Sequence, residues 1–189
     1  SNVFILQAFG ADTAGNTLMQ RTNGLGAIVK GINIEGKLVP SAKLQLQFGA
    51  TIQQSQYKEA IKWSDELAPQ TTMFRAPDQY GYLTASLQPT KKLSLSFSGT
   101  YTGSMLVQHY AGYIPRDIEV STKSFFDLTI KLMYDLAINN LTKLQLNLGA
   151  QNLFNSYQND FDKGINRDAA YIYGPALPRT VFAGIKIML

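Results

Sequence analysis

Apolar residues recur at every second position over long stretches of this sequence. In 93–102 the apolar or small residues are Leu93, Leu95, Phe97, Gly99 and Tyr101, with serine or threonine between them. A period of two is typical of a β-strand with one apolar and one polar face. The pattern returns at 42–52, 126–138, 144–150 and 181–189, more weakly at 28–34 and 83–87, and 3–9 is apolar nearly throughout. No segment has a helical period, so the sequence predicts an all-β antiparallel meander of about eight strands.

The length and polarity of these segments indicate a membrane barrel. The alternation runs well beyond the 5–6 residues or so of an average strand, and roughly 9–11 tilted residues cross a bilayer. Charged residues are 16% of the chain and hydrophobic residues 45%, whereas an average soluble domain has about 25% charged residues. The polar face is therefore mostly serine, threonine, glutamine and asparagine, which is typical of a crowded barrel interior.

The connections alternate between short and long. Short turns are expected near 37–41, 89–91 and 139–141, and long loops at about 53–72, 104–122 and 155–177. Turns at one end and long loops at the other are typical of outer-membrane barrels. Asn23-Gly24 is a hairpin signal that could divide 17–35 into two strands. We expect one strand beginning after it, because the residues before it are few and alternate poorly.

The residue inventory excludes several function classes. The chain has no cysteine, one histidine and a net charge of +4. It therefore contains no disulfide, no thiolate metal site, no cysteine nucleophile and no multi-histidine metal site. Lysine and arginine are scattered without a nucleic-acid motif, so we expect no nucleic-acid partner. The histidine follows no nucleophile elbow, and we expect no enzymatic activity. No segment has the 18 or so apolar residues of a membrane-spanning helix.

The last forty or so residues carry a resemblance to a known family. The segment Gly149-Ala150-Gln151-Asn152-Leu153-Phe154-Asn155 resembles the motif that ends the penultimate barrel strand of TonB-dependent outer-membrane receptors. Residues 178–186 look like the family's final strand, and 157–175 is similar to the last extracellular loop of receptors from the Bacteroides group. Upstream, 101–105 and Arg75-Ala76-Pro77 also resemble segments of these receptors.

This resemblance implies a place in a larger protein. Such receptors have a 22-stranded barrel filled by an N-terminal plug, and they lie in the outer membrane of Gram-negative bacteria. Residues 1–189 would then be the C-terminal third of the barrel, in contact with outer-membrane lipid. The resemblance also implies a nutrient ligand, namely an iron chelate, haem or cobalamin, with the TonB complex acting on a plug outside this chain. Such a third has two unpaired edges, which we expect to be paired by other strands.

The resemblance places ligand contacts in the long loops. The candidate contact residues are loop aromatics, the histidine and arginines, namely Trp63, Phe74, Arg75, His109, Tyr110, Arg116, Arg167, Tyr171 and Tyr173. His109 and Tyr110 could ligate haem iron, although a lone loop histidine is more often simply exposed. Phe74 and Arg75 could instead form a strand entry with Pro77 at a rim position. Trp63 could pack against its loop neighbours.

One loop has a candidate cation site. Asp160, Asp162 and Asp168, with Asn166, surround Gly164, and such oxygen ligands suit calcium. The spacing is not that of an EF-hand, and no other cofactor is expected. The alternative is a loop held by internal ion pairs that involve Lys163 and Arg167.

The preferred function is that of a receptor segment that binds and imports a scarce nutrient with energy supplied through TonB. An alternative is a self-contained eight-stranded outer-membrane barrel for adhesion or binding, because eight strands can close a small barrel. A soluble lipocalin-like carrier is disfavoured by the low charge.

Overall fold

The computed structural model describes residues 4–139 and 141–188. Their regular structure is entirely β, and none of these residues forms a helix with the length and hydropathy of a membrane span. The strands are β1 (Phe4–Ala11), β2 (Thr17–Asn23), β3 (Ala27–Ser41), β4 (Leu44–Ile61), β5 (Gln70–Thr72), β6 (Gln79–Leu87), β7 (Leu93–Thr102), β8 (Leu106–His109), β9 (Ile118–Ser121), β10 (Phe125–Ala137), β11 (Lys143–Gln151) and β12 (Thr180–Met188).

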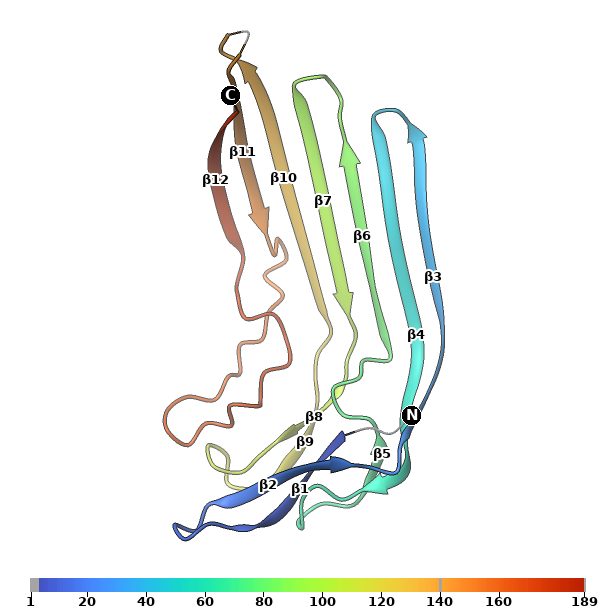
Figure 1. The fold of residues 1–189 in the computed structure, drawn as a ribbon, viewed down its shortest axis with the longest axis vertical. Helices are drawn as coiled ribbons and strands as arrows, with labels where there is room; N and C mark the ends of the chain where they lie inside the picture. The colour runs from blue at the N-terminus through green and yellow to red at the C-terminus, as the bar shows by residue number, and fades with distance from the viewer. Residues whose placement is uncertain (1–3, 140, 189) are drawn as a thin grey trace.

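One large antiparallel sheet organises the chain. Its strands lie in the order β12-β11-β10-β7-β6-β4-β3, and the short β5 pairs with β4 (Figure 1). With β5 the sheet has eight strands, so the predicted all-β antiparallel meander is confirmed. Two separate hairpins, β1-β2 and β8-β9, stand outside it.

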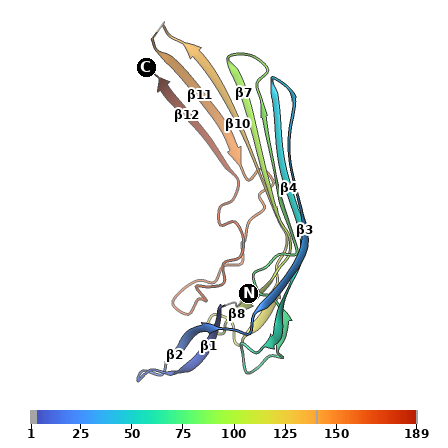
Figure 2. The same cartoon turned by 45° about the vertical axis from the view of Figure 1, so that its right-hand side comes forward.

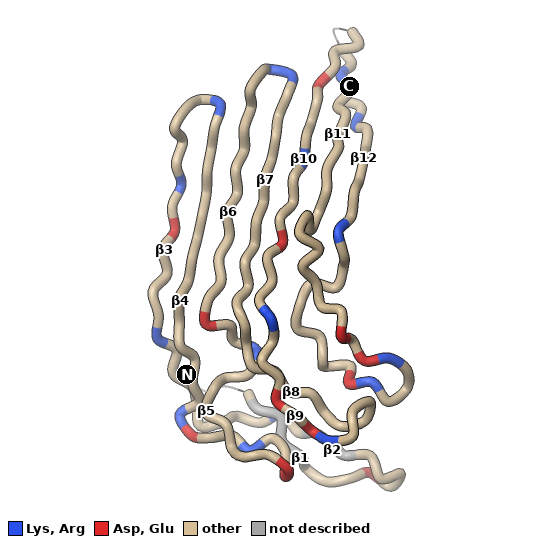
Figure 3. The backbone as a smooth tube through the Cα atoms, turned by 180° about the vertical axis from the view of Figure 1, so that it is seen from behind, with Lys and Arg blue, Asp and Glu red and all other residues tan. Residues whose placement is uncertain are grey.

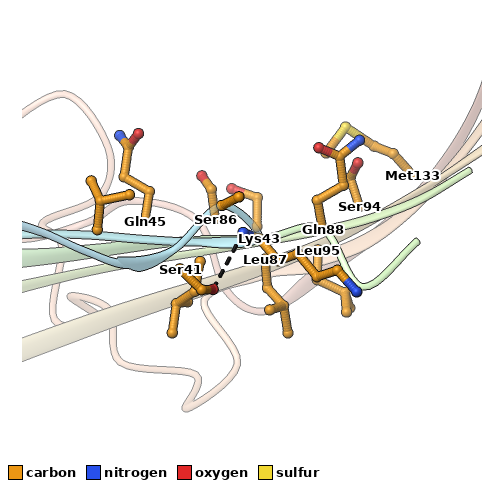
Figure 4. A pocket seen from close by; sticks show the side chains of 13 residues that line it. Ser41, Lys43, Gln45, Ser86, Leu87, Gln88, Ser94, Leu95 and Met133 are labelled. Atoms are coloured by element: carbon orange, nitrogen blue, oxygen red, sulfur yellow. Dashed lines mark hydrogen bonds between the residues drawn. The ribbon is translucent and has the colours of Figure 1, made fainter. Parts of the chain in front are cut away.

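The register of the sheet separates the side chains into two faces. Ile130 lies opposite Phe97 on β7 and Ala150 on β11, so apolar residues align across neighbouring strands. The next residue, Lys131, aligns with Ser96 and Gly149. Figure 4 shows the same alternation at the turn end, where Gln45, Ser86 and Ser94 project from one side of the sheet and Leu87 and Leu95 from the other. The period of two therefore produces an apolar face and a polar face.

The apolar face is open rather than packed. Ile32 on β3 is 69% exposed, and Val181 and Ile185 on β12 are 71% and 70% exposed. The buried hydrophobic residues among those described are Ala27, Val107, Phe125 and Tyr171. These four lie in or beside the loop end, so the packed core of the chain is there and not on the sheet. Charged residues are sparse along the strands and gather at the turns and loops (Figure 3).

The turns and loops gather at opposite ends, as predicted (Figure 1). The turn expected at 37–41 lies instead at 42–43, because β3 continues to Ser41. The first long loop is shorter than expected, because β4 continues to Ile61 and β5 pairs with it. The second contains the β8-β9 hairpin, and the third, 152–179, contains no strand.

The N-terminal segments differ from the sequence prediction. β1 is a strand, but it pairs with β2 instead of joining the large sheet. The expectation of a single strand in 17–35 was wrong, because β1 supplies the partner that stabilises the poorly alternating β2. The extended backbone is then interrupted at Gly26, which has a φ of 100°, before β3 begins. The described strands form an open sheet with β3 and β12 at its edges, so this structure is not the closed eight-stranded barrel of the alternative hypothesis.

The sheet is curved, and the third loop lies on its concave side with the β1-β2 hairpin (Figure 2). Phe125 fixes that placement, because it shares the polar face with Thr102 and its ring packs against Gly174 of the third loop. A Cβ at Gly174 would lie 2.4 Å from the Phe125 ring, so any larger residue there would have to displace that ring. The third loop therefore folds over the polar face.

Candidate functional site

The three long connections pack into one structure, which we call the loop cap and define as residues 62–78, 103–124 and 152–179. Arg75 joins all three parts. Its backbone N–H donates to the Leu106 carbonyl at 2.8 Å, and its guanidinium donates to the carbonyls of Ile172 at 2.9 Å and Ala170 at 2.5 Å. Arg75 has a φ of 59°, which is unfavourable for a residue with a Cβ. These hydrogen bonds hold it there, and Pro77 lies two residues before the start of β6.

His109 connects the β8-β9 hairpin to the third loop. Its Nε2 lies 2.9 Å from Oδ2 of Asp162, and the two side chains are 6% and 2% exposed. The His109 ring also stacks on Tyr171, with centroids 3.6 Å apart and planes 7° apart. Asp162 Oδ2 accepts a second hydrogen bond from the backbone N–H of Asp168 at 2.9 Å. His109 is therefore buried, hydrogen-bonded and stacked, whereas a lone loop histidine is usually exposed.

Asp160 accepts hydrogen bonds from two tyrosines. The Tyr171 hydroxyl donates to it at 3.1 Å, and the Tyr173 hydroxyl lies 2.7 and 2.8 Å from its two oxygens. Burial raises the pKa of Asp160, but the hydrogen bonds from Tyr173 and Tyr171 outweigh it and leave that pKa below its usual value. Burial, together with the Asp160 charge, raises the pKa of Tyr171 to about 12 and also raises the pKa of Tyr173. The site therefore favours a carboxylate held by two neutral phenols.

These shifts predict a pH range for the stability of the loop cap. The lowered pKa of Asp160 stabilises the folded cap above the usual carboxyl pKa, and this contribution is lost as the pH falls. The raised pKa of Tyr171 stabilises the cap below pH 10, and this contribution is lost as the pH rises from about 10 to about 12. We expect hydrogen exchange of 155–177 to accelerate above pH 10 beyond its intrinsic pH dependence. Tyr171→Phe should weaken that acceleration, and Tyr113→Phe, at an exposed position, should leave it unchanged.

Trp63, Phe74 and Tyr110 form an aromatic cluster. Trp63 meets Tyr110 edge-on at 5.1 Å between centroids and meets Phe74 edge-on at 6.0 Å. Its Nε1–H donates to Glu119 of β9 at 2.9 Å. Burial, then the charge of Asp168, raises the pKa of the Tyr110 hydroxyl. Packing against loop neighbours, the alternative that the sequence left open for Trp63, is what the structure shows.

Two asparagines and a glutamine hold the third loop, and sequence reasoning assigned them no role. Gln158 is fully buried, donates to the Tyr171 carbonyl at 3.1 Å and accepts from the N–H groups of Tyr173 and Gly174. Asn152 has a φ of 50° and Asn155 one of 53°, a conformation that asparagine tolerates better than most residues. Both asparagines belong to the motif at 149–155, so the resemblance located them without indicating what they do.

The carboxylates of the predicted cation site already accept hydrogen bonds from other groups of the protein. Asp160 accepts from tyrosines, Asp162 faces His109, and Asp168 accepts from the N–H groups of Tyr110 and Ala170. The described residues contain no group of three or more acidic, histidine or cysteine side chains placed to hold a metal ion. Calcium binding stays a prediction without a preformed ligand set.

The alternative of internal ion pairs is not what holds this loop. Within the described part of the chain the lysine ion pair is Lys62–Asp65, and neither it nor the His109–Asp162 contact involves Lys163 or Arg167. Arg167 instead donates to the Gly164 carbonyl at 3.0 Å. Arg116 is exposed between β8 and β9 and does not line the cavity described next.

A cavity of about 440 Å³ opens beside the aromatic cluster. It is lined by aromatic and cationic side chains, namely Phe4, Arg21, Tyr57, Ile61, Trp63, Phe74, Arg75 and Gln108. Tyr57 shares the polar face of β4 with Gln53 and Ser55, so the cavity lies on the same side of the sheet as the third loop. Arg21 and Phe4 come from the β2 and β1 strands, whose pairing the sequence did not predict. Flat rings and two positive charges suit an anionic ligand with aromatic groups.

Comparison with solved structures identifies the fold. Over 94% of this chain, the ferric-catecholate import receptor Fiu from E. coli K12, in its closed form, has a TM-score of 0.59 at 21% identity. Over 99% of this chain, P. aeruginosa FpvA bound to a pyoverdine and iron has a TM-score of 0.62 at 15% identity. FpvAI in complex with pyocin S2 has a TM-score of 0.61 at 16% identity over 99% of this chain. At these identities the likeness establishes the fold alone.

The fold is that of a segment of the barrel of TonB-dependent receptors. This chain spans 22% to 23% of the length of the matched chains. No model of a protein family matches the sequence, and a comparison with curated proteins finds no significant match. The Bacteroides-type assignment and the C-terminal position of the segment stay predictions.

Proposed function

We propose that this chain is a segment of a TonB-dependent outer-membrane receptor that imports a scarce nutrient. The observation that carries this proposal is the division of the structure into an open sheet with one apolar face and an ordered loop cap at one end. An apolar face of exposed Ile32, Val181 and Ile185 suits lipid rather than water. The loop cap is then the part that meets the nutrient outside the cell.

The open edges support a place within a larger barrel. β3 and β12 each have a neighbour on one side only among the described strands, and unpaired backbone groups are costly in lipid. Strands from the rest of the receptor would pair with both edges. In this proposal residues 1–189 form the C-terminal third of the barrel of a Gram-negative, Bacteroides-type receptor. The plug that engages the TonB complex lies elsewhere in the protein, and the segment itself is not an enzyme.

Among the three ligand classes the cavity favours an iron chelate. Arg21 and Arg75 supply positive charge, and Trp63 and Phe74 supply rings for stacking. One matched structure is named a ferric-catecholate import receptor and another is a complex with a pyoverdine and iron. Haem ligation is disfavoured, because His109 would have to leave Asp162 and the raised pKa of Tyr110 opposes a phenolate ligand.

The test is ligand binding and uptake by the full-length protein encoded by its gene. Cells that carry it should take up a radiolabelled ferric catecholate, and the purified protein should bind that chelate. Arg21→Gln removes a cavity charge that makes no hydrogen bond to a described residue, and about 10-fold weaker binding is expected, as is typical for a charged contact. Arg116→Gln is the matched control, because Arg116 is an exposed loop cation that does not line the cavity.

The outcomes separate the hypotheses. Uptake of haem or cobalamin but not of any iron chelate would retain the receptor and overturn the ligand class. Adhesion to surfaces without uptake of any of these ligands would favour a role in adhesion or binding over a role in transport. Equal chelate affinity in the Arg21→Gln and wild-type proteins would show that the cavity is not the binding site.

A further inference from the structure

The apolar face of the β3-β4 pair contains a groove near the loop end. It encloses about 630 Å³ between Ile32 and Ile34 of β3 and Ala50 and Ile52 of β4. Ile32 lies directly opposite Ile52, and the two side chains are 69% and 66% exposed. Lys30 and Gln54 border the groove on the side of the loops. The groove therefore has an apolar floor and a polar, cationic rim.

Two exposed lysines lie toward the loops from the apolar floor. Lys30 borders the groove, lies opposite Gln54 in the ladder and alternates in phase with Ile32 on the apolar face. Lys58 lies further toward the loops on β4, where its N–H donates to the Gly26 carbonyl at 3.0 Å. Gln54 and Gln56 stand between them on β4.

The other charged residues of β3 and β4 do not line the groove. Glu35 and Lys37 on β3 alternate to the opposite face, and Glu59 on β4 is not among the residues that line the groove. In the described part of the chain no carboxylate lies within 4.0 Å of Lys30 or Lys58. The charge that borders the groove is therefore positive, and it lies at one end of the apolar floor.

We propose that this groove binds a membrane lipid with a phosphorylated headgroup. The proposal rests on the proposed function, which places the apolar face in the bilayer. An acyl chain lies along Ile32, Ile34 and Ile52, where it replaces exposed apolar area with lipid contact. The phosphate lies at the rim, where ammonium groups attract it and the glutamine amides donate hydrogen bonds to its oxygens. A free phosphate would gain nothing from the apolar floor, so the occupant is a lipid.

Retention of lipid by the full-length protein tests this site. The protein is reconstituted into nanodiscs of phosphatidylcholine with a minor fraction of phosphatidylglycerol, released into detergent, and weighed by native mass spectrometry. The wild type should retain phosphatidylglycerol over its share of the bilayer. Lys30→Gln combined with Lys58→Gln should reduce that retention about 10-fold, because each lysine near an anionic lipid surface contributes on the order of a several-fold gain in affinity.

Two further variants distinguish the parts of the site. Lys37→Gln is the matched control, since Lys37 lies on the same strand but on the polar face, and it should retain lipid like the wild type. Ile32→Ser should weaken retention of long-chain phosphatidylglycerol more than that of a short-chain form. Added inorganic phosphate should not displace the long-chain lipid at equal concentration.

Three results would overturn the inference: unchanged retention in the double variant, equal loss in Lys37→Gln, or equal displacement by inorganic phosphate. Failure of the proposed function is recognised separately. A protein that does not insert into the nanodiscs contradicts the membrane assignment itself, whereas an inserted protein without lipid preference contradicts only the lipid site.

Discussion

Replacing His109 by alanine is expected to release the third loop from the β8-β9 hairpin. The substitution leaves the Asp162 carboxylate, which is 2% exposed, without its histidine partner, and it removes the stacking on Tyr171. Losing a hydrogen bond to a charged group costs about 1.5–3 kcal/mol, and losing an aromatic stack costs about 0.5–1.5 kcal/mol more. Since about 1.4 kcal/mol corresponds to a factor of ten, hydrogen exchange of 155–177 should accelerate by roughly 100-fold in the full-length protein.

A conservative variant and a neighbouring control make this result specific. His109→Gln keeps an N–H donor for Asp162, so its exchange should lie between that of the wild type and that of the alanine variant. Tyr113→Ala, at a position 53% exposed in the same hairpin connection, should leave the third loop protected. Equal protection in His109→Ala and wild type would mean that the histidine does not hold the loop.

Asn152→Ala should have the second largest effect, because this side chain fastens the two ends of the third loop. Its Oδ1 accepts from the Ser156 N–H at 2.8 Å, and its Nδ2 donates to the Ser156 and Leu177 carbonyls at 3.3 and 2.9 Å. The residue is 3% exposed, so alanine would leave buried backbone groups unpaired. Lost hydrogen bonds and a positive φ together should cost about 3 kcal/mol, measured as the loss of proteolytic resistance at 155–177.

A glycine variant at the same position separates the cost of the lost hydrogen bonds from the cost of the positive φ. Asn152→Gly also removes the hydrogen bonds, but it accepts a φ of 50° without strain, so it should be about 1 kcal/mol less damaging than alanine. Asn166→Ala removes an exposed asparagine from the same loop and should have little effect. If Asn152→Ala and Asn166→Ala were equally resistant to proteolysis, the assigned role of Asn152 would be wrong.

The sheet could be predicted from the sequence because the alternation that defines each strand lies within that strand's own residues. The side chains of β7 and β10 alternate between the apolar and the polar face of the sheet, so the alternation defines the strand and its faces before any partner is known. The ends of β3 and β4 were less predictable, because continued pairing extends both strands beyond the alternating residues. The β1-β2 hairpin was missed for a related reason, since β2 alternates poorly and depends on β1 for its pairing.

The loop cap could be predicted only in part. The sequence singled out His109 and Tyr171 as candidate contact residues and Asp162 as a candidate cation ligand, but nothing in their spacing indicates that they meet. Their contacts join segments far apart in the chain, and no periodic pattern connects such segments. Gln158 was missed because a buried glutamine differs from an exposed one only through the backbone groups around it, which belong to the folded loop.

The hydrogen bonds of Arg75 have a consequence for the order in which the protein forms. They join it to carbonyls 95 and 97 residues later in the chain, and His109 meets Asp162 across 53 residues. Hairpins such as β3-β4 and β6-β7 close short loops between sequence neighbours, so they can form early. The loop cap needs contacts between distant segments and is therefore expected to form last. A chain that ends before residue 170 would lack both β12 and the carbonyls that hold Arg75.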